Sequence, residues 1–164
     1  MTTDSPKLHR NAQHVQEALA SAGLDAKVRV LDDSARTVVE AAAALGVKEG
    51  QIAKSLVFLA GEEPMMVVAS GDEMVDTSKL ASMLGVAKVK RADADVVRAA
   101  TGYPIGGVSP AGLPSTLRVL VQESLQRWDV VWAAAGTHHA VFPSTYEELL
   151  QLTGGTPSNV GNRA

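Results

Sequence analysis

The sequence Ile-Ala-Lys-Ser-Leu-Val-Phe-Leu at residues 52–59 is followed by Gly-Glu-Glu-Pro at 61–64 and by Met-Met-Val-Val-Ala at 65–69. Both flanking runs are rich in residues that favour strands, and the glycine and proline between them favour a turn. Two such runs joined by a short turn predict an antiparallel β-hairpin. The strongest strand signal of the chain therefore belongs to a hairpin.

Helices are predicted wherever a capping residue precedes a run with helical periodicity. The predicted helices cover residues 6–22, 38–45, a short segment ending at 84, 94–100 and 146–152, and their expected N-terminal caps are Ser5, Thr37, Asp76 or Thr77, Asp93 and Ser144. Further strands are predicted at residues 27–31, 86–89, 117–121, 130–134 and 140–142, with a short helical turn after the strand at 117–121.

Hairpins dominate the order of these strands, which argues against a doubly wound parallel sheet. The sequence predicts an α+β fold with a single domain over residues 5–155. Its sheet is expected to be twisted and mixed, mostly antiparallel or barrel-like, and flanked by helices. Residues 156–164 are expected to form a flexible C-terminal tail.

The composition excludes several classes of protein. The chain of 164 residues contains no cysteine, so a thiol nucleophile, a thiolate metal site and a disulfide framework are ruled out. The sequence shows neither a run of 18 apolar residues nor a signal-peptide pattern, so we expect no membrane span and a cytoplasmic location. A net charge of −3 argues against a protein that grips long duplex nucleic acid, so any such contact should be local.

The most unusual stretch is Gly-Tyr-Pro-Ile-Gly-Gly-Val-Ser-Pro-Ala-Gly at residues 102–112. Its glycines and prolines break both helical and strand periodicity, so it is predicted to be a stiff loop. Such a loop can simply connect two elements through several turns. Alternatively, its bare backbone N–H groups can bind a phosphate, a carbonyl oxygen or a developing oxyanion.

Lys54 is the most informative single residue. A two-residue period places it on the same strand face as Ile52, Leu56 and Phe58. A lysine on an apolar face is costly unless its ammonium reaches water or an anion. It is therefore either a strand-end lysine that extends to solvent or a cation offered to a phosphate or carboxylate.

Other candidate groups are less specific. Ser109 precedes Pro110 without the Gly-x-Ser-x-Gly elbow of a serine nucleophile, so we interpret it as a hydrogen-bonding or loop-capping residue. His138 and His139 are adjacent and should point to opposite faces of a strand, so at most one faces the loop. The sequence contains no HExxH, Walker or Rossmann motif.

One basic cluster stands out in this acidic chain. It consists of Lys88, Lys90 and Arg91, with Arg98 nearby. Such a cluster is either a solvated strand face or a landing patch for a phosphate backbone.

Together these stretches resemble the YbaK/prolyl-tRNA-synthetase-associated editing domain family. The resemblance rests on residues 51–58 around Lys54, on 80–90, on 101–112, on Ala135-Gly136 and on the Tyr-Glu-Glu-Leu-Leu run at 146–150. It extends in unbroken order over residues 10–155. The Gly-Gly-Val-Ser-Pro loop combined with the upstream Ala-Lys-Ser-Leu is its most specific part.

The resemblance implies a free-standing deacylase that hydrolyses the ester of tRNA mischarged with a small amino acid, often on tRNA for proline, without metal or cofactor. The expected partner is the acceptor end of an aminoacyl-tRNA, and association with a synthetase is left open. The site residues expected from the resemblance and from the residues themselves are Lys54, Gly106 and Gly107 for catalysis, Val108, Ser109, Pro110, Gly136 and His138 for substrate binding, and Lys88, Lys90 and Arg91 for contact with tRNA. The spacing leaves open whether His138 or His139 matches the late histidine of synthetase-inserted relatives.

Two alternatives remain open on the sequence. One is a non-catalytic module of the same fold that binds a tRNA end or a nucleotide. The other is a hydrolase of another small ester or amide. Relatives that clear cysteine often carry a tyrosine near the position of Leu31 and a serine near that of Ala134, so their absence argues against cysteine as the amino acid removed.

Overall fold

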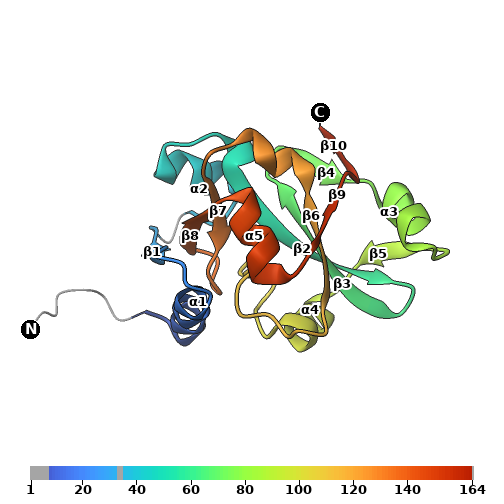
Figure 1. Ribbon diagram of the computed structural model, residues 1–164, viewed down its shortest axis with the longest axis horizontal. Coiled ribbons are helices and arrows are strands. Elements are labelled where there is room, and N and C mark those ends of the chain that lie inside the picture. Colours follow the sequence, from blue (N-terminus) through green and yellow to red (C-terminus); the bar gives the residue numbers. More distant parts are fainter. Residues whose placement is uncertain (1–7, 33–34, 164) are drawn as a thin grey trace, which may run out of the picture.

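The computed structural model describes residues 8–32 and 35–163 and folds them around one mixed sheet (Figure 1). Its eight strands follow the order β1-β8-β7-β2-β3-β6-β9, with β5 paired to β2 outside this path. The strands are β1 (Arg29–Val30), β2 (Ile52–Ala60), β3 (Glu63–Ser70), β5 (Val89–Arg91), β6 (Arg118–Gln122), β7 (Val131–Ala134), β8 (Ala140–Ser144) and β9 (Thr156–Ser158). A second sheet pairs β4 (Glu73–Val75) with β10 (Gly161–Arg163).

The pairing confirms the predicted α+β fold with a mixed sheet. Antiparallel pairs join β1 to β8, β8 to β7, β2 to β3 and β2 to β5. Parallel pairs join β2 to β7, β3 to β6 and β6 to β9. The sheet is open, because β1 and β9 end the strand order without pairing to each other, so the barrel-like alternative is not adopted.

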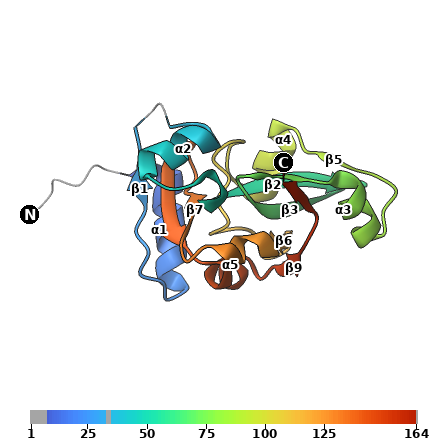
Figure 2. The same cartoon turned by 90° about the horizontal axis from the view of Figure 1, so that it is seen from above.

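Five α-helices cover this sheet in the part of the chain that the structure describes. They are α1 (Arg10–Ser21), α2 (Val38–Leu45), α3 (Thr77–Leu84), α4 (Ala94–Thr101) and α5 (Tyr146–Thr153), with short 3₁₀ turns at Glu49–Gln51 and Glu123–Arg127. Figure 2 shows α1 and α2 at the end of the molecule that carries β1 and β7, and α3 at the opposite end beside β5.

Strand β2 is the centre of the molecule, as the length of its apolar run suggests. Its alternating side chains supply two cores, since successive residues of a strand point to opposite faces. Ala53 and Val57 pack into the largest buried cluster with Leu19 of α1. Phe58 packs on the other face with Leu80 of α3.

Most predicted helix boundaries are confirmed. Thr37 and Glu40 form the expected capping box, in which Oγ1 of Thr37 accepts from the N–H of Glu40 at 3.1 Å and Oε1 of Glu40 accepts from the N–H of Thr37 at 3.0 Å. Asp76 and Asp93 cap α3 and α4 with their carboxylates.

Other boundaries differ from the prediction. The expected helix start at Ser5 lies outside the described residues, and α1 begins at Arg10 with His9 as its cap. The cap of α5 is Thr145, whose hydroxyl accepts from the N–H of Glu148, because Ser144 still belongs to β8. Strand β1 contains only two residues, and Val30 is exposed rather than half-buried.

The segment at 156–164, expected to lack regular structure, contains two short strands. Residues 156–158 extend the sheet beside β6 as β9, and residues 161–163 pair with β4 as β10. Gln122 connects these two strands, since its Oε1 accepts from the hydroxyl of Ser158 at 2.6 Å and from the N–H of Val160 at 3.0 Å. Three-residue strands carry too little periodicity to be recognised from sequence.

Candidate functional site

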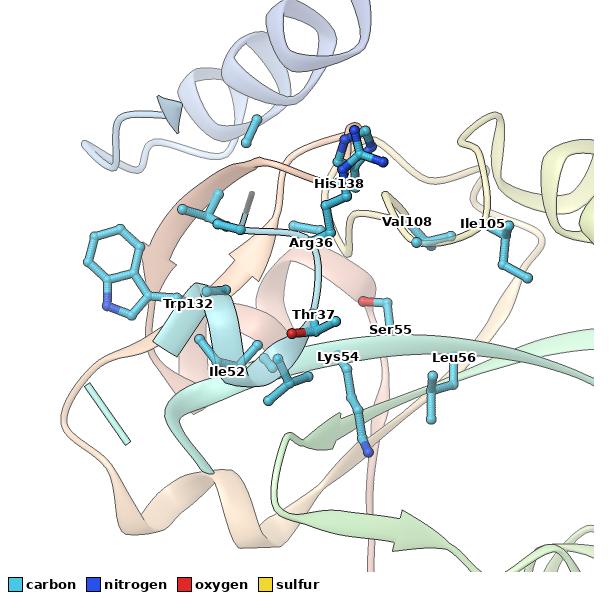
Figure 3. A pocket seen from close by; sticks show the side chains of 18 of the residues that line it. Arg36, Thr37, Ile52, Lys54, Ser55, Leu56, Ile105, Val108, Trp132 and His138 are labelled. Carbon is cyan, nitrogen blue, oxygen red and sulfur yellow. The ribbon is translucent and has the colours of Figure 1, made fainter. Parts of the chain in front are cut away.

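A cavity of about 340 Å³ lies between β2, the first turn of α2, strands β7 and β8, and the loop at 102–112. Lys54, Gly106, Val108 and His138, all predicted site residues, line this one cavity. Figure 3 shows His138 at one end of the cavity and Lys54 at the other, with Val108 and Ser55 between them. The structure therefore brings the lysine of β2 and the glycine-rich loop together, although about fifty residues separate them.

Strand β2 forms one wall of the cavity, along a stretch of its edge that has no partner strand. On this edge β2 pairs with β7 only at Ile52 and Ala53, and with β5 only from Phe58 onward. The carbonyl of Val57 accepts from the N–H of Ala92 beyond β5, so the backbone of Val57 faces this edge. Because backbone groups alternate between the two edges of a strand, the N–H and C=O of Ser55 face the gap.

The side chain of Ser55 adds a further polar group to this wall. Its hydroxyl oxygen is buried and has no hydrogen-bond partner among the described residues. A buried hydroxyl without a partner is unusual, because it forfeits the hydrogen bonds that it would make in water. In Figure 3 the Ser55 side chain and that of Lys54 leave the strand on opposite sides.

The side chain of Lys54 is held by β4, on the face of β2 opposite Ser55. Its Nζ donates to the carbonyl oxygen of Glu73 at 2.6 Å. Burial lowers the pKa of Lys54, the nearby carboxylates of Glu73 and Asp72 oppose that shift, and the positive charge of Arg91 adds to it. An ammonium has three donors, and only this one bond is formed within the described part of the chain. Lys54 is thus a partly desolvated cation, and two of its three N–H donors form no hydrogen bond within the described residues.

Glu73 is itself fixed by surrounding groups. Only 5% of its surface is exposed, and its Oε1 accepts from the N–H of Ser70 at 2.9 Å and from the hydroxyl of Ser124 at 2.8 Å. A carboxylate held in this way keeps the backbone of β4 in place under Lys54. The position of the ammonium is therefore set by a network that also includes β3 and the turn after β6.

The glycine-rich loop is stiffened by hydrogen bonds inside it. The buried Tyr103 donates its hydroxyl proton to the carbonyl of Ala111 at 2.6 Å, and burial raises the pKa of Tyr103 to about 12. The hydroxyl of Ser109 accepts from the N–H of Ala111 at 3.1 Å. Ser109 and Pro110 are buried and do not line the cavity, so their contribution is to the shape of the loop.

The backbone donors of the loop differ from the expectation at one position. The N–H of Gly107, expected to face the substrate, donates instead to the carbonyl of Pro104 at 3.0 Å. A Cβ at Gly107 would lie 2.9 Å from the backbone of Thr137, so this glycine permits close packing against the turn between β7 and β8. The N–H groups of Gly106 and Val108 have no partner among the described residues.

Gly106 is the loop residue whose conformation requires glycine. Its φ is +87°, and a Cβ there would meet nothing within 4 Å, because it would point into open space. An L-residue at this φ is strained, so glycine is favoured by backbone conformation and not by crowding.

The structure distinguishes the two adjacent histidines. His138 lines the cavity, whereas His139 does not. Gly136 also lies outside this cavity and accepts through its carbonyl from Nδ2 of Asn11 at 3.0 Å, which attaches α1 to the turn between β7 and β8.

The predicted basic cluster is divided by the fold. Arg91 lines the cavity, and its guanidinium lies over the ring of Phe58 at 5.6 Å from the ring centroid, whereas the exposed Lys88 and Lys90 do not line this cavity. Sequence reasoning missed Arg36 and Thr37, which reach the cavity because α2 packs above β2. The capping box at Thr37 predicts where α2 begins, but it does not predict that this helix start lies over β2 and lines the cavity.

No group of three or more potential metal ligands occurs in residues 8–32 and 35–163. Over the same residues, no helix is both long and apolar enough to cross a membrane.

Comparison with known proteins gives consistent matches. The aminoacyl-tRNA editing domain family matches residues 32–152. The uncharacterized protein YwhH of Bacillus subtilis is 34% identical over 127 residues, which are 77% of this chain and 80% of YwhH. EbsC of Enterococcus faecalis, named as a candidate Cys-tRNA(Pro)/Cys-tRNA(Cys) deacylase, is 32% identical over 123 residues, which are 74% of this chain and 73% of EbsC.

Longer enzymes and a solved structure also match. The proline–tRNA ligase of Geobacter sp. is 36% identical over 91 residues, which are 56% of this chain but only 16% of that enzyme. The crystal structure of a candidate trans-editing enzyme for prolyl tRNA synthetase superposes with a TM-score of 0.89 at 38% identity. That alignment covers 95% of this chain and 99% of the other.

Proposed function

Because the chain belongs to the aminoacyl-tRNA editing domain family, we propose that it is a free-standing deacylase that removes a small amino acid from mischarged tRNA for proline. The observation that carries this proposal is the single cavity lined by Lys54, Gly106, Val108 and His138. Proteins similar to this chain are named for editing on tRNA for proline or as part of the proline–tRNA ligase.

The reaction is the hydrolysis of an ester, in which water adds to the carbonyl carbon and the bond to the ribose oxygen then breaks. The negative charge that develops on the carbonyl oxygen needs hydrogen-bond donors held in place beforehand. The N–H groups of Gly106 and Val108 are suitable donors, because neither has a partner within the described residues and the loop that carries them is internally bonded. The leaving ribose oxygen takes up a proton, which gives the free amino acid and uncharged tRNA.

Lys54 supplies the positive charge of the site. Its ammonium lies on the side of β2 away from Ser55 and donates to Glu73, so it acts on the phosphate or ester region of the substrate through its positive electrostatic potential. Its partial desolvation strengthens this role, since a charge acts over a lower effective dielectric away from water. The imidazole of His138, at the other end of the cavity, is placed to contact the aminoacylated adenosine.

The size and lining of the cavity favour a small side chain. A volume of about 340 Å³ is near the lower limit for ligand sites, which favours a small aminoacyl group over a bulky one. Ala134 lines the wall and Leu31 is 8% exposed, so neither position supplies the polar group found in cysteine-clearing relatives. We therefore propose alanine as the preferred amino acid.

The proposed reaction is independent of metal, and the substrate is contacted at its acceptor end. The ester is already an activated acyl group, so positioned donors and one cation can suffice. Deacylase activity that is lost in chelator and regained with a divalent metal would contradict metal independence. If the protein contacts only the acceptor end, its activity should be equal on the aminoacylated acceptor-stem hairpin and on the whole tRNA.

A deacylation assay tests the proposal. Purified protein is mixed with tRNA for proline charged with alanine, serine, cysteine or proline, and the remaining aminoacyl-tRNA is followed in time. We expect rapid loss of alanine, slower loss of serine and cysteine, and retention of proline. Binding of the acceptor-stem hairpin without turnover on any of these substrates would instead identify a non-catalytic module.

A further inference from the structure

A second cavity of about 340 Å³ adjoins the first and is not used by the chemistry described above. It lies between the start of α1, helix α4 and the turn between β7 and β8. His138 lines both cavities, and Pro104 of the second immediately precedes Ile105 and Gly106 of the first. The two cavities therefore lie on either side of His138 and of the start of the glycine-rich loop.

The charged side chains that line the second cavity are all basic. Arg10 and Arg98 line it together with His9, His138 and His139, and no carboxylate is among its described lining residues. Neither arginine forms an ion pair with a carboxylate in the described part of the chain. Unpaired arginines that share a concave surface are suited to phosphate groups.

The walls of this cavity are held in fixed relation to each other. The side chain of Asn11 donates to the carbonyl of Gly136 at 3.0 Å, and a Cβ at Gly136 would lie 2.6 Å from Asn11. A Cβ at Gly107 would lie 2.9 Å from the backbone of Thr137, so these two residues also pack closely. The start of α1, the turn between β7 and β8 and the glycine-rich loop thus form one closely packed unit that presents Arg10. Arg98 belongs to α4, which is joined to the loop because the carbonyl of Arg98 accepts from the N–H of Gly102 at 2.8 Å.

We propose that this second cavity binds the sugar-phosphate backbone of the unpaired nucleotides that precede the aminoacylated 3′ nucleotide. The inference rests on the proposed function, because it places the terminal nucleotide in the first cavity. A strand that enters the first cavity past His138 has its preceding phosphates beside Arg10 and Arg98. The exposed Lys88 and Lys90, predicted from sequence as contacts to tRNA, line neither cavity.

The test compares Arg10→Ala, Arg98→Ala and the double variant with a control variant, Lys88→Ala combined with Lys90→Ala. Each is assayed on alanyl-tRNA for proline and on alanyl-adenosine, an ester without any phosphate. Counterion release of about 0.7 per phosphate on a single strand predicts a loss of about fivefold per arginine in kcat/KM at 0.1 M salt. The double variant should lose about 25-fold on tRNA by the same reasoning, and its salt dependence should be flatter by about 1.4 logarithmic units.

The same variants should keep wild-type rates on alanyl-adenosine, and the lysine control should stay near wild type on both substrates. Equal losses on tRNA and on alanyl-adenosine would overturn the proposal, because the arginines would then act on the reaction or the fold. A loss confined to the lysine control would also overturn it. Thermal unfolding of each variant identifies any that fails to fold.

A fluorescent acceptor-stem hairpin supplies a readout that does not depend on turnover. If the wild-type protein cleaves neither ester, the proposed function fails, and hairpin affinity still decides the role of the arginines. Weaker binding by Arg10→Ala and Arg98→Ala, with unchanged binding by the lysine control, supports the second cavity. Unchanged hairpin affinity in all variants overturns it.

Discussion

Strand β2 carries polar side chains on opposite faces at the adjacent residues Lys54 and Ser55, and only the first of them has a hydrogen-bond partner among the described residues. On one face Lys54 donates to the carbonyl of Glu73, and the carboxylate of Glu73 is held by Ser70 and Ser124. On the other face the hydroxyl of Ser55 is buried without a partner within the described residues. The protein itself supplies a hydrogen-bond partner to the charged side chain, whereas the hydroxyl in the cavity wall has none among the described residues.

This difference separates two tasks. Neutral groups on the open face, together with the N–H groups of Gly106 and Val108, are available to recognise the substrate. The lysine behind them sets the local electrostatic potential while Glu73 holds it in place. Variants on the two faces of β2 and in the glycine-rich loop test whether the tasks are divided in this way.

Replacing Lys54 with alanine should abolish most of the activity. Removal of one stabilising charge or donor from a preorganised site costs about 10²- to 10³-fold in rate, and we expect a loss in this range in kcat for alanyl-tRNA. Single-turnover deacylation measures it, and thermal unfolding shows whether the variant is folded. A folded Lys54→Ala protein with full activity would remove Lys54 from the site. Lys54→Arg keeps the charge and should recover part of the rate.

Replacing Gly106 with alanine should reduce activity by about tenfold, because a misplaced loop donor no longer matches the developing oxyanion. The positive φ of +87° makes alanine strained there, at a cost of about 1–2 kcal/mol in stability. Gly85→Ala is the matched control, since Gly85 has a φ of +70° and similar open space at the far end of the molecule. Comparable stability losses with activity lost only in Gly106→Ala are expected.

Replacing Ser55 with alanine tests the open face directly. One hydrogen bond to the substrate contributes about 0.5–1.5 kcal/mol, so we expect a loss of about two- to tenfold in kcat/KM without loss of stability. Ser109→Ala is the contrasting variant, because the Ser109 hydroxyl accepts from the N–H of Ala111 inside the loop. That variant should lose stability instead. Unchanged kinetics in Ser55→Ala would show that the open face does not contact the substrate.

The smallest effect concerns pH and stability. Because burial lowers the pKa of Lys54 in the folded chain, the unfolded chain binds more protons between that lowered pKa and the ordinary lysine value. The free energy of unfolding of the wild type should therefore rise with pH across this window, relative to Lys54→Met. Denaturant unfolding at several alkaline pH values measures the difference. A difference that falls with pH would mean that Lys54 is stabilised, and not penalised, by its surroundings.

The sequence predicted the elements and residues whose signals are local. The apolar run of β2, the capping box at Thr37 and the dense glycines of the loop can each be recognised within a few residues. The pairing of Lys54 with Gly106 in one site came from the family resemblance, and the cavity is consistent with it. The sequence left open whether His138 or His139 takes part in the site, and in the structure only His138 lines that cavity.

What the sequence could not supply depends on contacts between distant segments. The open edge at Ser55 exists because β7 and β5 pair with different parts of β2. The N–H of Gly107 donates to the carbonyl of Pro104 within a turn, and the residue composition of the loop does not specify the geometry of that turn. Arg98 was noticed only as a neighbour of a basic cluster, although in the fold it lines the same cavity as Arg10, which is distant in the sequence.

The most direct test of the central claim is a backbone amide shift map with a stable analogue, in which an amide replaces the ester of alanyl-adenosine. We predict that the largest shifts fall on Ser55, Gly106 and Val108, with smaller shifts at His138. Shifts concentrated instead around Trp128 and Lys48, which line a separate cavity, or no shifts at saturating analogue, would contradict the account.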